Sequence, residues 1–317
     1  MDFILEARNL KKTFSLDAGF FARNDKKVYA VNDVSFGIER GKTYGLVGES
    51  GCGKTTTARI LVGMYKADSG KILFGSDSMR DRKIMREKIK YVFQDPSRSL
   101  NPRMSVCSIL TEAYRYSSVF PGKKRAREEA GRLLEEVGLD ESDLDRLPSE
   151  FSGGQRQRIS IARGLIMKPE VLICDEIVSA LDVSVQGQIL NLLLDLKESR
   201  NLSFLFIAHD LRVSCYFCDT IGVMYSGVLV EEAPASDLYK TAEHPYTKLL
   251  FAGSQGRSMD KVDKVDKVDK AGEVKTVLES VGGCPFAHRC PHSMEKCRTS
   301  LPEWKSVSEN HKVRCWL

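Results

Sequence analysis

The chain has 317 residues, 42% hydrophobic and 29% charged, which is the composition of a globular protein large enough to bury a core. Its 48 basic and 43 acidic residues leave a net charge of +5, too small an excess to indicate a nucleic-acid partner. No run of eighteen apolar residues occurs, and the N-terminus is charged and alternating. We therefore expect no membrane span, no signal peptide, and a protein that stays in the cytosol unless a partner holds it elsewhere.

The first part of the chain reads mainly as strands. Hydrophobic patterns predict strands over 3–10, 28–41, 42–49 and 89–95. Residues 15–27 have no clear period and are interpreted as a hairpin loop. Residues 55–64 are predicted to be helical, and turn signals follow at 68–77.

The pattern changes to helices between about residues 96 and 150, with 123–139 as the clearest helix and Gly138 as its stop. Strands and helices then alternate, with apolar strands over 171–176 and 202–209, a helix over 186–200 and a hairpin over 220–232. Apolar strands that alternate with helices predict an α/β fold, with a mostly parallel sheet covered on both faces.

The C-terminal part has a different composition. We expect the main domain to span 1–252, a linker to span 253–275, and a small cysteine-rich module to span 276–317. The linker carries the repeat "DKVDKVDKVDK", which has compensating charges and nothing large to bury. Nine cysteines divide into five scattered ones, interpreted as small buried apolar residues, and four clustered ones near the C-terminus.

One motif predicts a phosphate-binding loop. The segment "GESGCGKTT" (48–56) satisfies G-x-x-x-x-G-K-[ST], directly after an apolar strand and at the start of a predicted helix. Backbone N–H groups and the helix N-terminus suit phosphate oxygens, while Lys54 would reach the β- and γ-phosphates and Thr55 would bind Mg²⁺. The predicted nucleotide-binding residues here are Gly48, Glu49, Ser50, Gly51, Cys52, Gly53, Lys54, Thr55 and Thr56.

A second motif supplies carboxylates. The apolar strand "VLICDE" ends in Asp175, which can hold Mg²⁺ at the carboxyl edge of the sheet, and Glu176, which can act as general base. Alone, this pattern is more often a strand that runs into a solvated turn. Together with the phosphate loop, it indicates hydrolysis of a nucleoside triphosphate.

The segment "FSGGQRQR" (151–158), with the motifs above, resembles the signature of ATP-binding cassette (ABC) ATPases. Gln94 in "VFQDP", "SALD" (179–182) and His209 in "FIAHD" match further family motifs in the right order. The resemblance implies a P-loop NTPase core with an antiparallel β subdomain and a helical subdomain at about 96–150.

The resemblance also implies roles. Such ATPases form head-to-tail dimers, so Ser152, Gly153, Gly154 and Gln155 would bind the partner's nucleotide. Glu176, His209 and Gln94 would be catalytic, and Mg²⁺ would be held by Thr55, Gln94 and Asp175. Phe14 would stack on adenine, with Tyr29 as its rival. Ile177 stands where the family most often has proline, which puts the local geometry after Glu176 in question.

Further segments indicate which branch of this family the chain resembles. The segments "GESGCGKTTTARIL", "QDPSRSLNPRMSV", "EFSGGQRQRISIARGL" and "EHPYTKLL" are similar to ATP-binding subunits of oligopeptide and dipeptide importers. The resemblance implies an ATPase at the cytoplasmic face of the membrane that powers peptide import. Its partners would be two permease subunits, a sister ATP-binding subunit (or a second copy of the chain) and, indirectly, an extracytoplasmic substrate-binding protein.

The clustered cysteines run C-x5-C-x6-C-x17-C and comprise Cys284, Cys290, Cys297 and Cys315. Four thiolates are a ligand set for an iron–sulfur cluster or for zinc. The tail resembles the C-terminal extension of peptide-transporter ATPases, some of which hold a [4Fe–4S] cluster. Zinc remains the alternative because His288, His292 and His311 lie nearby, although no tight C-x2–4-C pair occurs; unligated thiols or disulfides are the third reading.

Three alternatives to peptide import stay open. A nickel or other small-solute importer would share the same ATPase motifs. A soluble ABC ATPase that acts on nucleic acid or ribosomes usually carries two cassettes or a long insertion, and the sequence has neither. A redox carrier is disfavoured because one cluster at the end of a linker offers no electron route.

Overall fold

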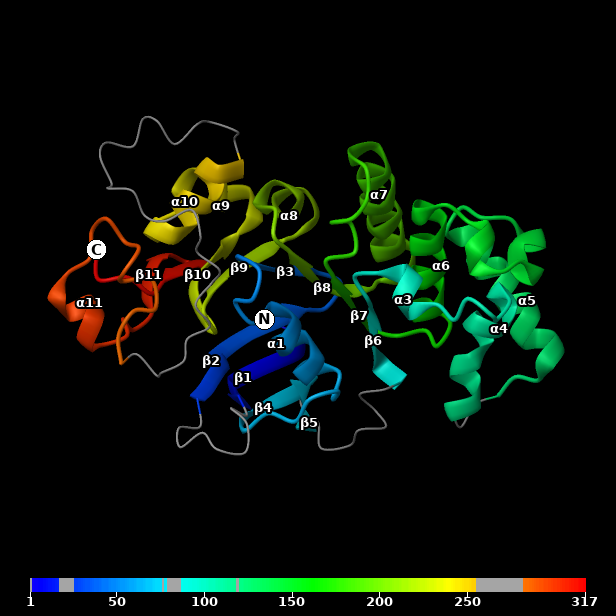
Figure 1. The fold of residues 1–317 in the computed structure, drawn as a ribbon, viewed down its shortest axis with the longest axis horizontal. Coiled ribbons are helices and arrows are strands. Elements are labelled where there is room, and N and C mark those ends of the chain that lie inside the picture. The colour runs from blue at the N-terminus through cyan, green and yellow to red at the C-terminus, as the bar shows by residue number, and fades with distance from the viewer. Residues whose placement is uncertain (1, 17–25, 76, 79–86, 118–119, 255–281) are drawn as a thin grey trace.

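The computed structural model describes residues 2–16, 26–75, 77–78, 87–117, 120–254 and 282–317. Within these residues the fold has an eight-stranded sheet, a four-stranded sheet and helices around them (Figure 1). Most of the hairpin loop expected at 15–27, and the whole DKV repeat at 260–270, lie outside the described residues.

The eight-stranded sheet has the order β11-β12-β10-β9-β3-β8-β7-β6. The five strands from β9 to β6 are parallel, and the remaining three are antiparallel. The parallel strands are β9 (Thr220–Tyr225), β3 (Thr43–Val47), β8 (Ser203–Ala208), β7 (Val171–Asp175) and β6 (Ile89–Val92). All residues of β3, β7 and β8 are buried, as expected for strands with both faces covered. The predicted parallel sheet is confirmed.

The second sheet is antiparallel, with the order β2-β1-β4-β5. Its strands are β1 (Phe3–Leu16), β2 (Lys26–Glu39), β4 (Ser69–Phe74) and β5 (Asp77–Ser78). The turn expected over 68–77 is therefore wrong, because most of that segment is β4. Exposure explains the error: half of β4 faces solvent, so "SGKILF" has no clean apolar alternation.

Helices form the end of the molecule beyond β6 (Figure 1). Between residues 96 and 165 lie α3 (Pro96–Ser99), α4 (Val106–Thr111), η1 (Glu112–Tyr116), α5 (Lys123–Glu136), η2 (Glu141–Asp145), η3 (Pro148–Glu150) and α6 (Gly153–Leu165). The predicted helix at 123–139 is confirmed, and Gly138 has the left-handed φ of 74° that favours glycine directly after a helix. The predicted helical region at 96–150 is present and continues into α6.

The remaining helices cover the eight-stranded sheet. These are α1 (Lys54–Leu61), α7 (Val183–Arg200), α8 (Leu211–Phe217), α9 (Ala235–Thr241) and α10 (Pro245–Ser254). Of the scattered cysteines, Cys52, Cys174 and Cys218 are buried as expected, whereas Cys107 and Cys215 are partly exposed. Among the described helices, none is long and apolar enough to cross a bilayer.

The C-terminal segment packs onto the opposite end from the helical region (Figure 1). It contains α11 (Glu295–Thr299), β11 (Lys305–Ser308) and β12 (His311–Val313), and β12 pairs with β10 (Val228–Pro234). The fully buried Glu231 of β10 contacts His311 Nε2 at 2.8 Å. Cys284, Phe286 and Cys297 share a hydrophobic core with the eight-stranded sheet. The described cysteine-rich residues thus extend the main sheet.

Candidate functional site

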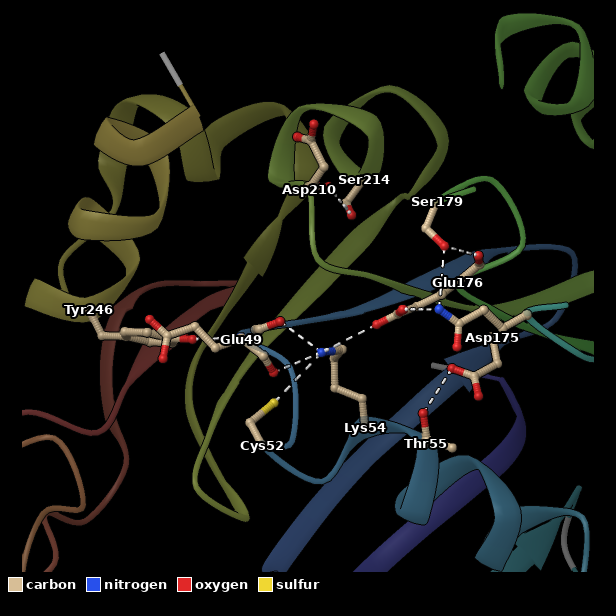
Figure 2. Close-up of polar contacts among 12 residues, drawn as sticks. Glu49, Cys52, Lys54, Thr55, Asp175, Glu176, Ser179, Asp210, Ser214 and Tyr246 are labelled. Atoms are coloured by element: carbon tan, nitrogen blue, oxygen red, sulfur yellow. Dashed lines mark hydrogen bonds and ion pairs between the residues drawn. The ribbon is translucent and has the colours of Figure 1, made fainter. Parts of the chain in front are cut away.

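The phosphate loop connects the buried strand β3 to α1, as the motif predicts. Lys54 is the first residue of α1, and its side chain is only 3% exposed. Its ammonium group donates to the carbonyl oxygens of Gly48 (2.7 Å) and Glu49 (3.0 Å), so it points into the concave side of the loop (Figure 2). A phosphate oxygen is a stronger acceptor than either carbonyl, which makes this lysine a suitable phosphate ligand.

A pocket of about 250 Å³ opens beside this loop. Its walls are formed by the phosphate loop, the N-terminal part of β2, the residue that follows β7 and the turn between β9 and β10. They comprise Val28, Tyr29, Ala30, Ser50, Gly51, Gly53, Lys54, Thr55, Thr56, Gln94, Glu176, Ser226 and Gly227. Backbone N–H groups, one cation and a helix N-terminus suit a polyphosphate.

Two of the three residues expected to hold Mg²⁺, Thr55 and Asp175, contact each other beside this pocket. Thr55 Oγ1 donates to Asp175 Oδ1 at 3.1 Å (Figure 2). The other oxygen, Asp175 Oδ2, accepts a hydrogen bond from the Tyr91 hydroxyl. Burial raises the pKa of Tyr91 well above its usual value, so this hydroxyl stays protonated and donates. Sequence reasoning missed Tyr91, although it directly precedes the motif "VFQDP" that contains Gln94.

Glu176 faces the lysine and the glutamine. Its Oε1 lies 3.8 Å from Lys54 Nζ, and its Oε2 accepts from Gln94 Nε2 at 2.8 Å. The backbone of Glu176 has a φ of +49°, a conformation that non-glycine residues seldom adopt and that often marks functional sites. Ile177 is 1% exposed and belongs to the core, so the family's usual proline is replaced by a packing residue while Glu176 still faces Lys54.

His209 directly follows β8, the strand next to β7. Because Asp175 pairs with Ile207 in parallel register, His209 lies at the same sheet edge as Glu176. Its side chain is exposed, and it is not among the pocket-lining residues. The motif "SALD" (179–182) begins close to Glu176. Ser179 Oγ donates to the Glu176 carbonyl oxygen at 2.8 Å.

The signature residues lie outside this pocket, at the start of α6. Ser152 caps the helix: its Oγ accepts from Gln155 N–H at 3.3 Å, and Gln155 Oε1 accepts from Ser152 N–H at 2.9 Å. Gly153 and Gly154 follow, and Ser152 and Gly153 are exposed. An exposed helix start far from the chain's own phosphate loop can serve the nucleotide of a partner.

The two candidates for adenine stacking occupy adjacent strands. Tyr29 lines the pocket, whereas the Phe14 ring packs edge-on against Tyr65 with centroids 5.6 Å apart. Phe14 pairs directly with Val28, another pocket-lining residue, so these two side chains emerge on the same face of the β1–β2 pair.

Glu49 contacts two residues that sequence reasoning did not place in the site. Its N–H donates to the Tyr246 hydroxyl oxygen at 2.8 Å (Figure 2), and its carboxylate pairs with Arg289 at 2.8 and 3.1 Å. Tyr246 belongs to "EHPYTKLL", a segment that indicated only the family branch. Arg289 lies in "CPFAHRC", a segment that the sequence analysis considered only for its metal-binding side chains.

The four clustered cysteines line one small cavity of about 20 Å³, together with His244 and His292. As placed, no group of three or more His, Cys, Asp or Glu among the described residues forms a metal-ion ligand set. Burial raises the pKa of Cys284 to about 11, and the other three cysteines add to this effect. His311, one of the histidines considered for zinc, is engaged with Glu231, and His288 is exposed.

Comparisons with known proteins found family models and relatives that match this chain. The family model "ABC transporter" matches residues 31–179, and "Oligopeptide/dipeptide transporter, C-terminal region" matches residues 230–297. The oligopeptide transport ATP-binding protein AppF of Bacillus subtilis is 42% identical over 99% of this chain and 97% of its own length. The dipeptide transport ATP-binding protein DppF of Haemophilus influenzae is 39% identical over 99% and 96%, respectively.

Solved structures share the fold. The ATP-binding cassette MJ0796, in a dimeric post-hydrolysis state with ADP and phosphate, superposes with a TM-score of 0.64. It is 26% identical in sequence, and the match covers 73% of this chain and 98% of that one. The cbiO1 subunit from Clostridium perfringens gives the same TM-score over 75% and 91% of the two chains.

Proposed function

This chain belongs to the ABC transporter family, among the ATP-binding subunits of oligopeptide and dipeptide transporters, and on that premise we propose that it hydrolyses ATP to power peptide import through a separate permease. The observation that carries this proposal is the meeting of Lys54, Gln94 and Glu176 at one pocket. The match of residues 230–297 to the family model for the C-terminal region of oligopeptide/dipeptide transporters supports the substrate class.

ATP binding uses the loop and the start of α1. The β- and γ-phosphates accept hydrogen bonds from the loop N–H groups and from Lys54, which exchanges its carbonyl partners for phosphate oxygens. Thr55 and Asp175, which are already in contact, would hold Mg²⁺. Mg²⁺ would neutralise charge that develops on the phosphate oxygens during transfer.

Hydrolysis requires a water in line with the γ-phosphate. Glu176 would accept a proton from this water, and the Gln94 amide orients the carboxylate through the 2.8 Å contact. His209, at the same sheet edge, would contact the γ-phosphate once the subunits close. Most of the acceleration would come from positioning and from charge stabilisation, as in phosphoryl transfer generally.

The second half of each site would come from a partner subunit. The exposed cap formed by Ser152, Gly153, Gly154 and Gln155 presents backbone N–H groups at a helix start, which suits a γ-phosphate. We propose a head-to-tail pair with a sister ATP-binding subunit, in which each phosphate loop faces the other signature. For adenine we propose stacking on Phe14, beside Val28, with Tyr29 as the competing residue.

The assembly would sit at the cytoplasmic face of a membrane. Two permease subunits would form the pathway and receive peptide from an extracytoplasmic binding protein. Gln94 leads directly into the helical region at its Asp95 cap, which makes this region the proposed contact with the permease.

We propose further that Cys284, Cys290, Cys297 and Cys315 hold a [4Fe–4S] cluster. The support is that all four line one cavity and none of them forms a disulfide. Such a cluster would cross-link the C-terminal segment and stabilise it, because a segment this short has little hydrophobic core of its own. Zinc is the competing ligand, since His292 and His244 line the same cavity.

Reconstitution tests the main proposal. Vesicles that contain this chain, its sister subunit and the two permeases should accumulate a labelled oligopeptide when ATP and the binding protein are supplied. Glu176→Gln should abolish ATP hydrolysis and uptake but retain ATP in a stable dimer. Uptake of nickel in place of peptide would assign the chain to small-solute import, and unchanged turnover of the variant would contradict the role of Glu176.

A further inference from the structure

Glu49, the second residue of the phosphate loop, is held at three points. Its carbonyl oxygen accepts from Lys54 Nζ at 3.0 Å, and its N–H donates to the Tyr246 hydroxyl at 2.8 Å. Its carboxylate receives both terminal nitrogens of Arg289, at 2.8 and 3.1 Å. Figure 2 shows the Glu49 side chain turned toward Tyr246, away from Thr55 and Asp175. One loop residue therefore connects the catalytic lysine to the C-terminal part of the chain.

Arg289 is held in position by its own surroundings. Its guanidinium lies 5.8 Å from the ring centroids of both Tyr225 and Phe286. Phe286 in turn contacts Tyr246 (5.4 Å) and Tyr225 (5.2 Å), so the aromatic rings and the guanidinium pack as one group behind the loop. Two donors on one carboxylate give an ion pair with a fixed orientation, unlike most single-contact surface pairs.

The charges explain why this contact matters for ATP. A carboxylate in a phosphate-binding loop repels a triphosphate, and the loop has Lys54 as its own cation. Arg289 neutralises Glu49 and keeps its side chain turned outward. The Glu49 side chain is 28% exposed and that of Arg289 is 38% exposed, so solvent screens the pair only in part. Without the arginine, the carboxylate would remain charged and free to approach the phosphates.

We propose that Arg289, supplied by the cysteine-rich segment, is a positioning residue for ATP binding that acts through Glu49. The proposal rests on the proposed function, because it concerns the nucleotide site of that same ATPase. Arg289 lies between Cys284 and Cys290 and one residue before the latter, so whatever orders the cysteine cavity also orders this contact. The segment thereby becomes part of the ATP site although it contributes no ligand to the nucleotide.

Arg289→Gln tests the proposal on the full chain, purified without oxygen. We expect the Kd for a fluorescent non-hydrolysable ATP analogue and the KM for ATP to rise about tenfold, the usual effect of a lost charged hydrogen bond. We expect kcat at saturating ATP to stay within about twofold, because the residue acts on binding rather than on the reacting atoms. Arg289→Lys, which keeps the charge but not the two-pronged contact, should recover part of the affinity.

Two further variants separate this mechanism from others. Arg298→Gln removes the same charge from an exposed position of the same segment and should leave Kd unchanged within about twofold. In a Glu49→Gln background no carboxylate needs neutralising, so adding Arg289→Gln should raise Kd by less than about twofold. Thermal midpoint and metal content of each variant report on whether the segment stays folded.

Three results would overturn the proposal: an unchanged Kd in Arg289→Gln, an equal rise in Arg298→Gln, or the same tenfold rise in the Glu49→Gln background. If Arg289→Gln does not fold, Arg289→Lys decides instead, because loss of the two-pronged contact should still raise its Kd above that of the wild type, and an unchanged Kd would overturn the proposal. Failure of the peptide-import function would appear as lost uptake in vesicles, while these binding measurements on the wild-type chain would be unaffected.

Discussion

The Tyr91 hydroxyl donates a hydrogen bond to Asp175 Oδ2, while Thr55 occupies the other oxygen of the same carboxylate. Asp175 is only 4% exposed, so its carboxylate depends on these two partners for hydrogen bonds. Tyr91 lies on β6, which pairs with β7, the strand that ends at Asp175. This pairing fixes the position of the tyrosine relative to the aspartate. The carboxylate is thereby oriented before any metal ion binds.

Tyr91→Phe removes only the hydroxyl and should weaken Mg²⁺ binding. A hydrogen bond to a charged group contributes about 1.5–3 kcal/mol, so we expect the Mg²⁺ concentration for half-maximal ATPase activity to rise roughly tenfold or more. Tyr216→Phe is the control, because the Tyr216 hydroxyl donates to Asn191 and not to Asp175. A Mg²⁺ dependence identical to the wild type would show that Thr55 alone orients the carboxylate.

Motifs that are continuous in sequence predict the core of the site. Lys54 and Thr55 belong to one loop, and Asp175 and Glu176 end one apolar strand. Because parallel strands share a carboxyl edge, the two motifs are expected to meet there, and the structure brings them together. Strands with both faces buried, such as β7 and β8, were also predictable from their continuous apolar runs.

Contacts between distant parts of the chain were not predictable. Tyr91 reaches Asp175 across 84 residues, Tyr246 reaches Glu49 across 197, and Arg289 reaches Glu49 across 240. Tyr91 lies on a strand, Tyr246 at a helix start and Arg289 in a turn, and the partner of each depends on how separate elements pack. The pairing of β12 with β10 was missed for the same reason, since "HKV" is too short to predict a strand.

The adenine-stacking residue can be decided with two alanine variants. Stacking of a base on an aromatic ring contributes about 1–3 kcal/mol, so Phe14→Ala should raise the KM for ATP roughly tenfold. Phe14→Tyr should preserve it, and Tyr29→Ala should have a smaller effect because Phe14 is the proposed stacking residue, although Tyr29 lines the pocket. The opposite ranking of the two alanine variants would assign adenine to Tyr29.

The cysteine cavity makes a prediction about metal content. Protein purified without oxygen should be brown and contain about four irons and four acid-labile sulfides per chain, the composition of a [4Fe–4S] cluster. Cys297→Ser, at a buried position of the cavity, should lose most of this iron. Cys215→Ser, at a partly exposed position outside the cavity, should retain it. Colourless protein with one zinc ion per chain would contradict the cluster.

The attachment of the C-terminal segment should depend on His311. Glu231 is fully buried, and its carboxylate accepts hydrogen bonds from the N–H groups of Glu243 and His244 and contacts His311 Nε2. His311→Ala removes one of these three partners and should lower the free energy of unfolding by about 2 kcal/mol, seen as a lower thermal midpoint.

Two variants show whether the buried carboxylate is the cause of that loss. Val307→Ala, at an exposed position on the neighbouring strand β11, should leave the midpoint nearly unchanged. Glu231→Gln should restore part of the stability in the His311→Ala background, because a neutral amide is less costly to bury than a carboxylate. If Glu231→Gln instead destabilises both backgrounds equally, the two side chains are not coupled, and β12 is held by its backbone pairing with β10 and by packing.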